Sequence, residues 1–386
     1  MFEIKTMNNI AQQGLDELAA NGLILNMNQE NPDGLLIRSA KLHDAEFGDR
    51  LLAIARAGVG TDNVPIERCT EAGIAVFNTA GANAEAVKEL AICALLMSSR
   101  DIMGGITWVN AISSHPDIAA EVEKNKASYV GPEIYGKTLG IIGLGAIGSR
   151  IANAAEDLGM TVYGYDPYLS VDAAWRLSRK IKHAPDIETI FRLSDYVLVQ
   201  VHYTPETHHM IGAAEIAKMK PGVRVINLAR GELVDDDAML AALSCGKVAH
   251  YVTDFPNNKI VGTRGVIATP HLGASTPESE EKCAVMAAQE LADYLINGNL
   301  KNSVNLPNVN LERQGVCRLC VIHKNVPRML NSFLDLIGQA NINVEHMINS
   351  ARGEIAYTMI DLGSTLDEAL AETIRNMPDV KRVRVI

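Results

Sequence analysis

Three glycines and one aspartate have the types and the spacing to hold a dinucleotide. Gly143, Gly145 and Gly148 form a GxGxxG run directly after the apolar stretch TLGII, and a helical pattern follows them. In that setting the first glycine permits a tight turn, the second lets a pyrophosphate approach the backbone, and the third lets helix and strand pack closely. Asp166 stands about 20 residues further on, where a carboxylate accepts hydrogen bonds from ribose hydroxyls.

The residues around this motif favour NAD over NADP. The chain continues after Asp166 as PYLS, without an Arg or Lys to receive a 2′-phosphate, and the carboxylate itself would repel one. Ala146 and Ile147 complete the glycine run and are counted with the cofactor residues. The alternative is a glycine-rich turn that binds nothing. A nicotinamide cofactor would direct the chemistry toward hydride transfer.

Two residues that could carry the reaction follow later apolar runs. Arg230 lies in NLARGELVD and His271 lies in TPHLGAST. A guanidinium presents a fixed fork of donors to a carboxylate. An imidazole, with a reference pKa of about 6.5, can take up or release a proton near neutral pH. Because the carboxyl ends of strands in open α/β sheets face the ligand crevice, we expect both side chains there. A structural histidine at a strand end is the alternative.

The elements that must position these residues alternate between strand and helix. Short apolar runs recur with room for a helix between them, which predicts a doubly wound parallel sheet. The predicted strands span residues 33–39, 51–58, 196–201, 224–229, 249–255 and 265–270. A strand, a glycine turn, a helix and a second strand fill residues 136–167.

Composition excludes several classes of function. The chain has 386 residues, 47% of them hydrophobic, and a formal net charge of −11, so no basic patch predicts nucleic-acid binding. No apolar run predicts a membrane span or a signal peptide, and we expect a cytoplasmic protein. Cys317 and Cys320 form a CxxC pair without a second pair, so we expect no metal site. On a strand the two would face opposite sides, which favours a structural role over the alternative, redox chemistry.

The last seventy or so residues have the pattern of a separate small domain. After Gly298 a polar, Pro-containing stretch at 305–315 reads as a linker. The order beyond it is βαββαβ, typical of a ferredoxin-like fold. The predicted elements are a strand at 318–322, a helix at 327–339, strands at 342–350 and 354–361, a helix at 365–376 and a strand at 380–386.

Residues 50 to 300 resemble the D-2-hydroxyacid dehydrogenases, through GLGAIG, NLARGELVD, TDF, TPHLGAST and RAGVGTDNV. The resemblance implies that Arg230 binds the substrate carboxylate and that His271 exchanges a proton with the C2 oxygen. It also implies a Rossmann-type NAD domain inserted in a flavodoxin-like substrate domain. The implied domains are a substrate-binding domain at 1–96 and 275–306, an NAD domain at 97–274 and a regulatory domain at 316–386.

The same resemblance implies further contacts with cofactor and substrate. Asp254 would accept a hydrogen bond from the nicotinamide carboxamide. The other cofactor residues would be Leu228, Ala229, Gly273 and Ala274. For the substrate, the implied residues are Arg56, Ala57, Gly58 and Asn83, with Arg38 as a possible addition. For Arg56, a solvated surface charge is the alternative.

The chain departs from that family at the glutamate that usually hydrogen-bonds the histidine. TDFPNNK is one residue shorter than the usual turn and has no glutamate. An amide could still orient the imidazole, or a carboxylate could reach it from the next helix. The candidates are Asn257, Asn258, Lys259, Glu278 and Glu280.

The tail resembles an ACT domain, a small amino-acid-sensing module, through HKNVPRML followed by NINVEHM. In phosphoglycerate dehydrogenases with such a domain, a pattern of one histidine and two asparagines holds L-serine at a domain interface. The matching residues are His323, Asn325 and Asn343. Arg328 replaces the usual glycine after the proline, which could alter the turn into the helix. A helix cap with two loop amides and no ligand is the alternative.

These resemblances imply an NAD-dependent oxidation of 3-phospho-D-glycerate to 3-phosphooxypyruvate, the first step of serine synthesis, with serine as effector. Another D-2-hydroxyacid dehydrogenase, acting on glyoxylate, a lactate-like acid or a phosphoerythronate, is one alternative. A non-catalytic regulator that senses NAD is another. ACT domains commonly pair edge to edge, so we expect a homodimer or homotetramer. If serine inhibits, the hinge between residues 305–315 and the tail is where we expect regulatory movement.

Overall fold

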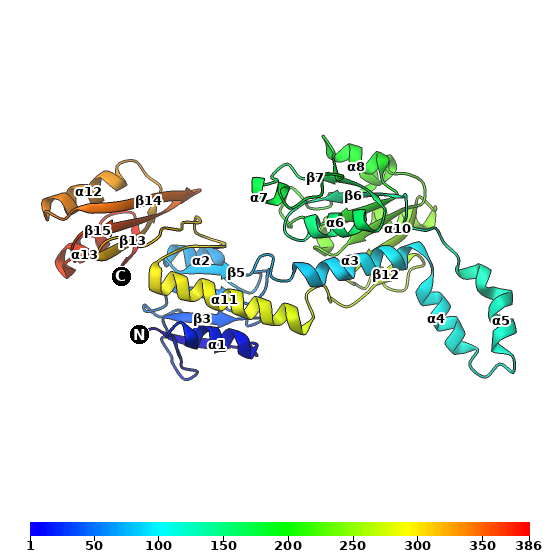
Figure 1. Cartoon of the computed structure of the whole chain (residues 1–386), viewed down its shortest axis with the longest axis horizontal. Helices are drawn as coiled ribbons and strands as arrows, with labels where there is room; N and C mark the ends of the chain where they lie inside the picture. Colours follow the sequence, from blue (N-terminus) through cyan, green and yellow to red (C-terminus); the bar gives the residue numbers. More distant parts are fainter. The chain divides into compact units, whose positions relative to one another are not determined.

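The computed structural model describes residues 1–386 apart from the side chain of Asp172. The chain forms two compact units, residues 1–83 with 277–386 and residues 84–276 (Figure 1). We expected the first boundary at residue 96. It lies instead at the start of helix α3 (Ala84–Ser99), because α3 packs against α6 (Gly148–Asp157) within the second unit.

The second unit is a Rossmann-type domain, as predicted. Its seven parallel strands have the order β12-β11-β10-β9-β6-β7-β8, and the order reverses between β6 and β9, where dinucleotides bind in such sheets. The strands are β6 (Thr138–Ile142), β7 (Thr161–Tyr165), β8 (Lys182–His183), β9 (Tyr196–Val199), β10 (Val223–Asn227), β11 (Val248–Thr253) and β12 (Val266–Ala268). The central strand β9 is buried throughout, as expected for a parallel sheet between helical layers.

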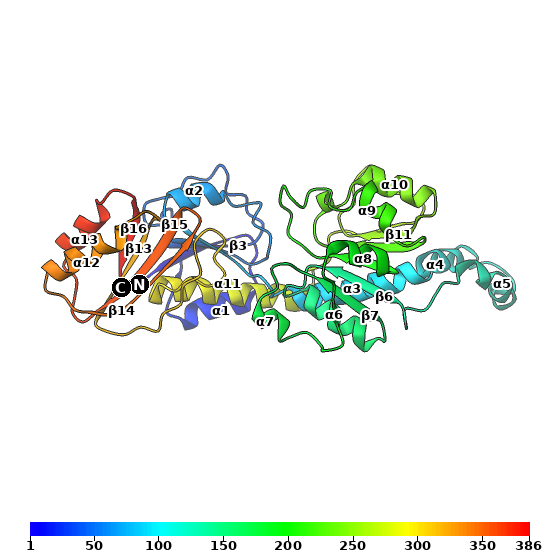
Figure 2. The ribbon, with the colours of Figure 1, turned by 90° about the horizontal axis from the view of Figure 1, so that it is seen from above.

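Helices cover this sheet and extend beyond it (Figure 2). They are α3, α4 (Ile102–Ala111), α5 (Ile118–Asn125), α6, α7 (Val171–Ala174), α8 (Ile187–Leu193), α9 (Ala213–Lys218) and α10 (Asp236–Ser244), with 3₁₀ turns η1 (Lys126–Tyr129) and η2 (Gly231–Leu233). Within the described chain no single helix is long and apolar enough to cross a bilayer. Helices α3 and α4 together have the length and apolar composition of a span, but they meet at a bend of 69°.

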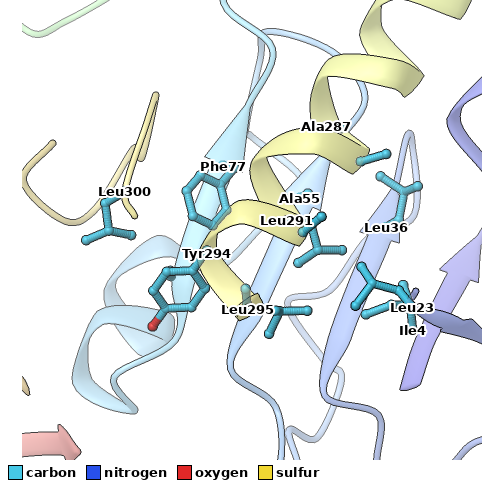
Figure 3. Close-up of a cluster of buried hydrophobic side chains, with 14 of the residues drawn as sticks. Ile4, Leu23, Leu36, Ala55, Phe77, Ala287, Leu291, Tyr294, Leu295 and Leu300 are labelled. Atoms are coloured by element: carbon cyan, nitrogen blue, oxygen red, sulfur yellow. The ribbon is translucent and has the colours of Figure 1, made fainter. Parts of the chain in front are cut away.

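The first unit holds a smaller parallel sheet of flavodoxin-like order, β2-β1-β3-β4-β5. Its strands are β1 (Glu3–Met7), β2 (Ile24–Leu25), β3 (Gly34–Ile37), β4 (Ala53–Arg56) and β5 (Ala75–Asn78), and its helices are α1 (Gln12–Ala20), α2 (Ile66–Glu71) and α11 (Pro277–Asn297). Helix α11 packs over the sheet, with Ala287, Leu291 and Leu295 facing Leu36 and Ala55 (Figure 3).

The C-terminal residues form the predicted βαββαβ unit, whose antiparallel sheet has the order β14-β15-β13-β16. Its elements are β13 (Cys317–Lys324), α12 (Met329–Gln339), β14 (Val344–Arg352), β15 (Ile355–Leu362), α13 (Glu368–Arg375) and β16 (Val380–Val385). Cys317 belongs to the core beneath the two helices and Cys320 to the core shared with α11, so the two thiols face opposite sides as expected. All six cysteines are free.

The 305–315 stretch differs from the exposed linker that its composition predicts. Leu306, Val309 and Leu311 are buried in the core of the first unit. The buried Asn305 uses its side chain fully: its Oδ1 accepts from Val76 N at 2.9 Å and its Nδ2 donates to Ile74 O at 2.9 Å. Asn305 therefore holds this segment to the first unit by hydrogen bonds, which the composition of the segment does not reveal.

Arg328 keeps the turn into α12 at the cost of a strained backbone. It has φ 72° and ψ 0°, the left-handed region that glycine adopts without a Cβ penalty. We expect Arg328→Gly to raise the free energy of unfolding by about 0.5–1 kcal/mol, because relief of strain exceeds the added entropy of the unfolded chain. Urea unfolding measures this. Arg328→Ala keeps the Cβ and is the matched control, and an equal gain in both variants would contradict the explanation.

Helix α11 carries a buried carboxyl group, Glu290, whose side chain is only partly satisfied. Its Oε1 accepts from Asn302 Nδ2 at 2.6 Å, and its Oε2 has no partner among the described residues. Burial raises the pKa of Glu290 from 4.5 to about 8. The folded state therefore holds a proton that the unfolded chain releases, and stability falls as pH rises from about 4.5 through 8.

Replacement of Glu290 with glutamine should remove this pH dependence. We expect Glu290→Gln to match the parent near pH 4 and to exceed its free energy of unfolding by a few kcal/mol above pH 8, at ~1.4 kcal/mol per pH unit. Urea unfolding across that range measures the difference. Glu281→Gln on the same helix should leave the pH dependence unchanged. A parallel offset of Glu290→Gln at every pH would show that Glu290 does not titrate in this range.

Candidate active site

The glycine turn between β6 and α6 has the shape that the motif predicts. Gly143 has φ 94°, and a Cβ on it would lie 2.3 Å from Gln200 O. A Cβ on Gly148 would lie 2.0 Å from Gly143 O, whereas nothing lies within 4 Å of the Cβ position of Gly145. The first and third glycines are thus required by close approaches, and the second leaves open space above the backbone. Ala146 and Ile147 are half-buried between them.

Asp166 ties this turn to the end of β7. Its Oδ2 accepts from Leu144 N at 2.9 Å, and its Oδ1 accepts from Tyr168 N at 2.9 Å. Each oxygen keeps a second lone pair for a ribose hydroxyl. The structure therefore brings the glycines and the acid together at one end of the sheet, where the residues fit the adenosine half of a dinucleotide.

A buried asparagine, not identified from the sequence, holds the Arg230 loop at the end of β10. Asn227 is fully buried; its Nδ2 donates to Arg230 O at 2.8 Å and its Oδ1 accepts from Ala229 N at 3.2 Å. Arg230 donates from Nη1 to Ala229 O at 2.7 Å. Leu228 and Ala229 are buried beneath this loop. The loop therefore has a fixed backbone from which the half-buried guanidinium extends.

Phe255 lies near both candidate catalytic side chains. Its ring centroid is 4.7 Å from that of His271 and 6.0 Å from Cζ of Arg230. The ring packs against the exposed imidazole and lies beside one face of the guanidinium. Sequence reasoning used TDF only as part of a motif and assigned Phe255 no role. An aromatic residue directly after a strand-end aspartate was the available signal.

Asp254 is the buried acid of this cluster. Its Oδ2 accepts from Gly273 N at 3.2 Å, whereas its Oδ1 is buried without a partner among the described residues. Burial raises the pKa of Asp254, and the nearby His271 and the Gly273 N–H oppose that rise, with a smaller contribution from Arg230. The unused oxygen could accept from a cofactor amide. Ala274 follows Gly273 and is half-buried.

Three of the five candidates for the missing glutamate are engaged elsewhere. Asn257 donates from Nδ2 to Asp236 Oδ2 at 2.9 Å, Lys259 pairs with Asp237 at 2.7 Å, and Glu280 pairs with Arg38. Asn258 and Glu278 are exposed, and no contact with His271 distinguishes them. The acid whose charge interacts with His271 is Asp254, which was not among the five candidates.

The candidate substrate cations lie in the first unit at the ends of β3 and β4. Arg56 Nε donates to Arg38 O at 3.0 Å, and a Cβ on Gly58 would lie 2.7 Å from Arg56 Nη1. Arg38 and Glu280 form an ion pair whose side chains are 41% and 40% exposed. Two guanidinium groups thus share one strand-end edge, which suits an anionic ligand.

Ala57 and Gly58, two of the predicted substrate residues, use their backbone N–H groups in internal hydrogen bonds. Ala57 N donates to Ile37 O at 2.8 Å and Gly58 N donates to Arg56 O at 2.9 Å, so neither amide is free for an anion. The Ala57 N–H extends the pairing of β4 with β3, and the Gly58 N–H closes a tight turn onto Arg56. Asn83, in contrast, is buried, and its Oδ1 has no partner among the described residues.

The three predicted serine ligands do not converge within one chain. His323 is 2% exposed; its Nδ1 is 2.7 Å from Lys324 O and its Nε2 is 2.8 Å from Thr358 Oγ1, so both ring nitrogens are occupied. Burial lowers the pKa of His323, which favours the neutral ring. Asn325 and Asn343 are exposed. Alternation along β13 turns His323 toward Phe333 of α12, which the motif did not indicate.

Comparisons with known proteins agree with this geometry. Residues 92–273 match the family model described as D-isomer specific 2-hydroxyacid dehydrogenase, NAD binding domain. The D-3-phosphoglycerate dehydrogenase of Haemophilus influenzae is 32% identical over 356 residues, which are 88% of this chain and 82% of that protein. The D-3-phosphoglycerate dehydrogenase of Methanocaldococcus jannaschii is 32% identical over 326 residues, 82% of this chain but only 58% of its own length.

A solved structure supports the same assignment. NAD⁺-bound 3-phosphoglycerate dehydrogenase from Entamoeba histolytica aligns with a TM-score of 0.61 and 25% identity, over 79% of this chain and 98% of that one. The chain belongs to the D-isomer specific 2-hydroxyacid dehydrogenase family and carries that family's NAD-binding domain.

Proposed function

We propose that this chain oxidises 3-phospho-D-glycerate to 3-phosphooxypyruvate with NAD, as the first step of L-serine synthesis. The observation that carries the proposal is that Arg230 and His271 both lie near the ring of Phe255, and that the charges of both interact with the buried Asp254. Relatives that match most of this chain are named D-3-phosphoglycerate dehydrogenase, which supports this substrate. A cytoplasmic location remains a prediction that accompanies this function.

The residues of the second unit suit NAD and the reaction that it serves. The open space at Gly145 and the free lone pairs of Asp166 fit a pyrophosphate and a ribose, and the unused Asp254 Oδ1 fits a carboxamide donor. When bound, NAD accepts the hydride from C2 of the substrate. Arg230 would hold the substrate carboxylate through its donor fork, and His271 would take the proton of the C2 hydroxyl.

Asp254 would stabilise the imidazolium that forms when His271 takes this proton. Its negative charge favours the charged ring, the part that a glutamate plays in relatives. We expect Asp254→Asn to lower kcat/KM by about 10- to 100-fold, at ~1.4 kcal/mol per factor of ten. Steady-state rates with saturating NAD measure the change. Asp237→Asn, an exposed acid on α10, is the control, and equal rates for Asp254→Asn and the parent would exclude this role.

Arg38 and Arg56 are the groups that we assign to the substrate's phosphate. Charge-assisted hydrogen bonds from two guanidinium groups would favour a dianion over a neutral hydroxyl. Asn83, with its unpaired buried oxygen, would contact a hydroxyl of the substrate. D-Glycerate and D-lactate, which lack the phosphate, should therefore be poor substrates.

L-Serine and a homo-oligomer belong to the same proposal. In the sheet register Val344 and Cys317 both align with Leu362, whereas His323 aligns with Ala356, six residues along the strand. At about 3.3 Å per residue, the levels of Val344 and His323 are ~20 Å apart, and Asn343 and Asn325 lie beyond them at the two opposite ends of the sheet. Antiparallel pairing of the edge strand β14 with β14 of a second copy would bring these opposite ends together. Serine would then bind Asn325 of one copy and Asn343 of the other, with His323 holding the strand end.

A second surface supports a homotetramer. Helix α4 buries none of its residues, and Ile102, Met103, Ile106 and Val109 are each 38% to 51% exposed. Such a stripe of apolar side chains suits a second two-fold contact. Light scattering with and without serine would give the mass. A monomer under both conditions would contradict the interface proposal, and Asn343→Ala should abolish serine inhibition while the exposed Asn376→Ala should not.

The test of the reaction is a comparison of substrates. NADH formation is followed with 3-phospho-D-glycerate, D-glycerate and D-lactate, and NADP replaces NAD in a parallel series. The proposal predicts a kcat/KM at least about 100-fold higher with the phosphorylated substrate, from a charge-assisted contact of ~3 kcal/mol, and little rate with NADP. Equal rates on all three acids would contradict the phosphate site.

A further inference from the structure

The C-terminus of helix α11 is capped by side chains from the C-terminal sheet. The last carbonyls of any helix lack partners within the helix. Arg384 donates to two of them, and Arg318 and Tyr357 donate to one carbonyl each at or just beyond the end. The distances are 2.9 Å to Tyr294 O and 2.6 Å to Leu295 O from Arg384, 2.7 Å to Asn297 O from Arg318, and 2.7 Å to Gly298 O from Tyr357.

These capping contacts are buried and complementary in charge. Arg318, Tyr357 and Arg384 are 0%, 1% and 9% exposed. A cation at a helix C-terminus also opposes the partial negative charge of the helix dipole. Arg384 lies 4.6 Å from the ring centroid of Tyr294, the residue whose place against the sheet of the first unit Figure 3 shows. The end of α11 is therefore bound by the C-terminal sheet at several points at once.

Gly298 shows how closely the end of α11 approaches strand β13 of the C-terminal sheet. It follows α11 with φ 79°, and a Cβ on it would lie 2.6 Å from Cys320 Sγ. Arg382 on the same strand as Arg384 donates to Leu51 O at 2.9 Å and to Ala72 O at 3.1 Å. Leu306, Val309 and Leu311, just before the C-terminal sheet, are also held in the core of the first unit.

The other end of α11 reaches the candidate substrate cations. Glu280, in its first turn, forms the ion pair with Arg38. Between the ends, a Cβ on Gly14 of α1 would lie 2.7 Å from Ala284 Cβ, which shows how tightly the helix is packed. A helix of 21 residues is about 30 Å long. One rigid element thus spans from the C-terminal sheet to Arg38.

We propose that the capping by Arg384, Arg318 and Tyr357 holds the C-terminal sheet and the parallel sheet of the first unit together as one body. Displacements of the C-terminal sheet then reach Arg38 through α11 and Glu280. Arg384 is then a positioning residue for the substrate cation, although about 15 residues of α11, or ~22 Å of helix, separate its contacts from Glu280. The link to substrate affinity rests on the function proposed above. The mechanical link does not.

The test compares Arg384→Met with Arg375→Met in the full chain. Arg375 is a matched control, since it lies in the same domain and pairs only with exposed acids of its own helix. We expect Arg384→Met to speed amide exchange at the end of α11 and also at residues 37–40 and 279–283. It should raise KM for 3-phospho-D-glycerate at least fivefold with kcat within twofold, and Arg384→Lys should restore part of both effects.

Exchange that rises only at the C-terminal end of α11 and in the C-terminal sheet would overturn the proposal. Tyr357→Phe removes a single donor and gives the same readout if Arg384→Met does not fold. Amide exchange needs no turnover, so an inactive chain would refute the proposed function while this measurement still decided the mechanical link. A KM change that is equal in the Arg375→Met control would also overturn the proposal.

Discussion

Replacement of His271 with glutamine should lower kcat by about 10²- to 10⁴-fold, the usual contribution of a positioned general acid–base group. Glutamine can still donate a hydrogen bond to the C2 oxygen, but it cannot take the hydroxyl proton. Arg230 does not depend on the imidazole for its backbone position, because Asn227 holds its loop. Substrate affinity should therefore change much less than the rate.

Steady-state kinetics with 3-phospho-D-glycerate, together with NAD binding by fluorescence, would separate these effects. His183→Gln, which alters an exposed histidine on β8, should retain full activity. If His271→Gln retained more than a tenth of the rate, the proton would have another acceptor. The role assigned to His271 and Asp254 would then be wrong.

The largest expected effect on stability comes from Arg318. Its guanidinium and the carboxylate of Asp361 are both fully buried, and two hydrogen bonds of 2.6 Å and 2.8 Å join them. We expect Arg318→Met to lower the free energy of unfolding by about 3–5 kcal/mol, because the carboxylate would stay buried without its partner. The end of α11 would also lose its bond to Asn297 O.

Urea unfolding would measure this loss, and Arg318→Met with Asp361→Leu is the matching double variant. It should recover much of the stability, since no charge then remains buried. Burial would raise the pKa of Asp361, but hydrogen bonds from Arg318 and Gln314 N outweigh it and lower that pKa. The contribution is thus present at neutral pH and is lost as pH falls through the folded pKa. A loss below 1 kcal/mol for Arg318→Met would contradict this account.

The sequence predicted those parts of the site whose chemistry is local. Gly143, Gly148 and Asp166 act through backbone angles and short offsets, so their spacing carried the information. Arg230 and His271 became candidates because each follows an apolar run, because parallel strands end on one edge of a sheet, and because their segments resemble those of the dehydrogenase family. The βαββαβ order of the tail was predictable for the same reason.

What the sequence did not reveal depends on contacts between distant segments. Phe255 and Asn227 look ordinary until the loops after β10 and β11 meet. Nothing in the sequence pattern marks Arg318 and Arg384, yet each is buried against the end of α11. His323 was expected to face a ligand, but strand alternation turns it toward Phe333.

Transfer of deuterium from C2 of the substrate to the cofactor tests the central claim most directly. 3-Phospho-D-[2-²H]glycerate is incubated with the enzyme and NAD, and the NADH is analysed by mass spectrometry. The 2-deuterated L-isomer serves as control. We predict that NADH formed from the D-isomer carries the deuterium and that the L-isomer yields none. NADH without deuterium, or an equal yield from both isomers, would contradict hydride transfer from a D-2-hydroxy acid at the site of Arg230 and His271.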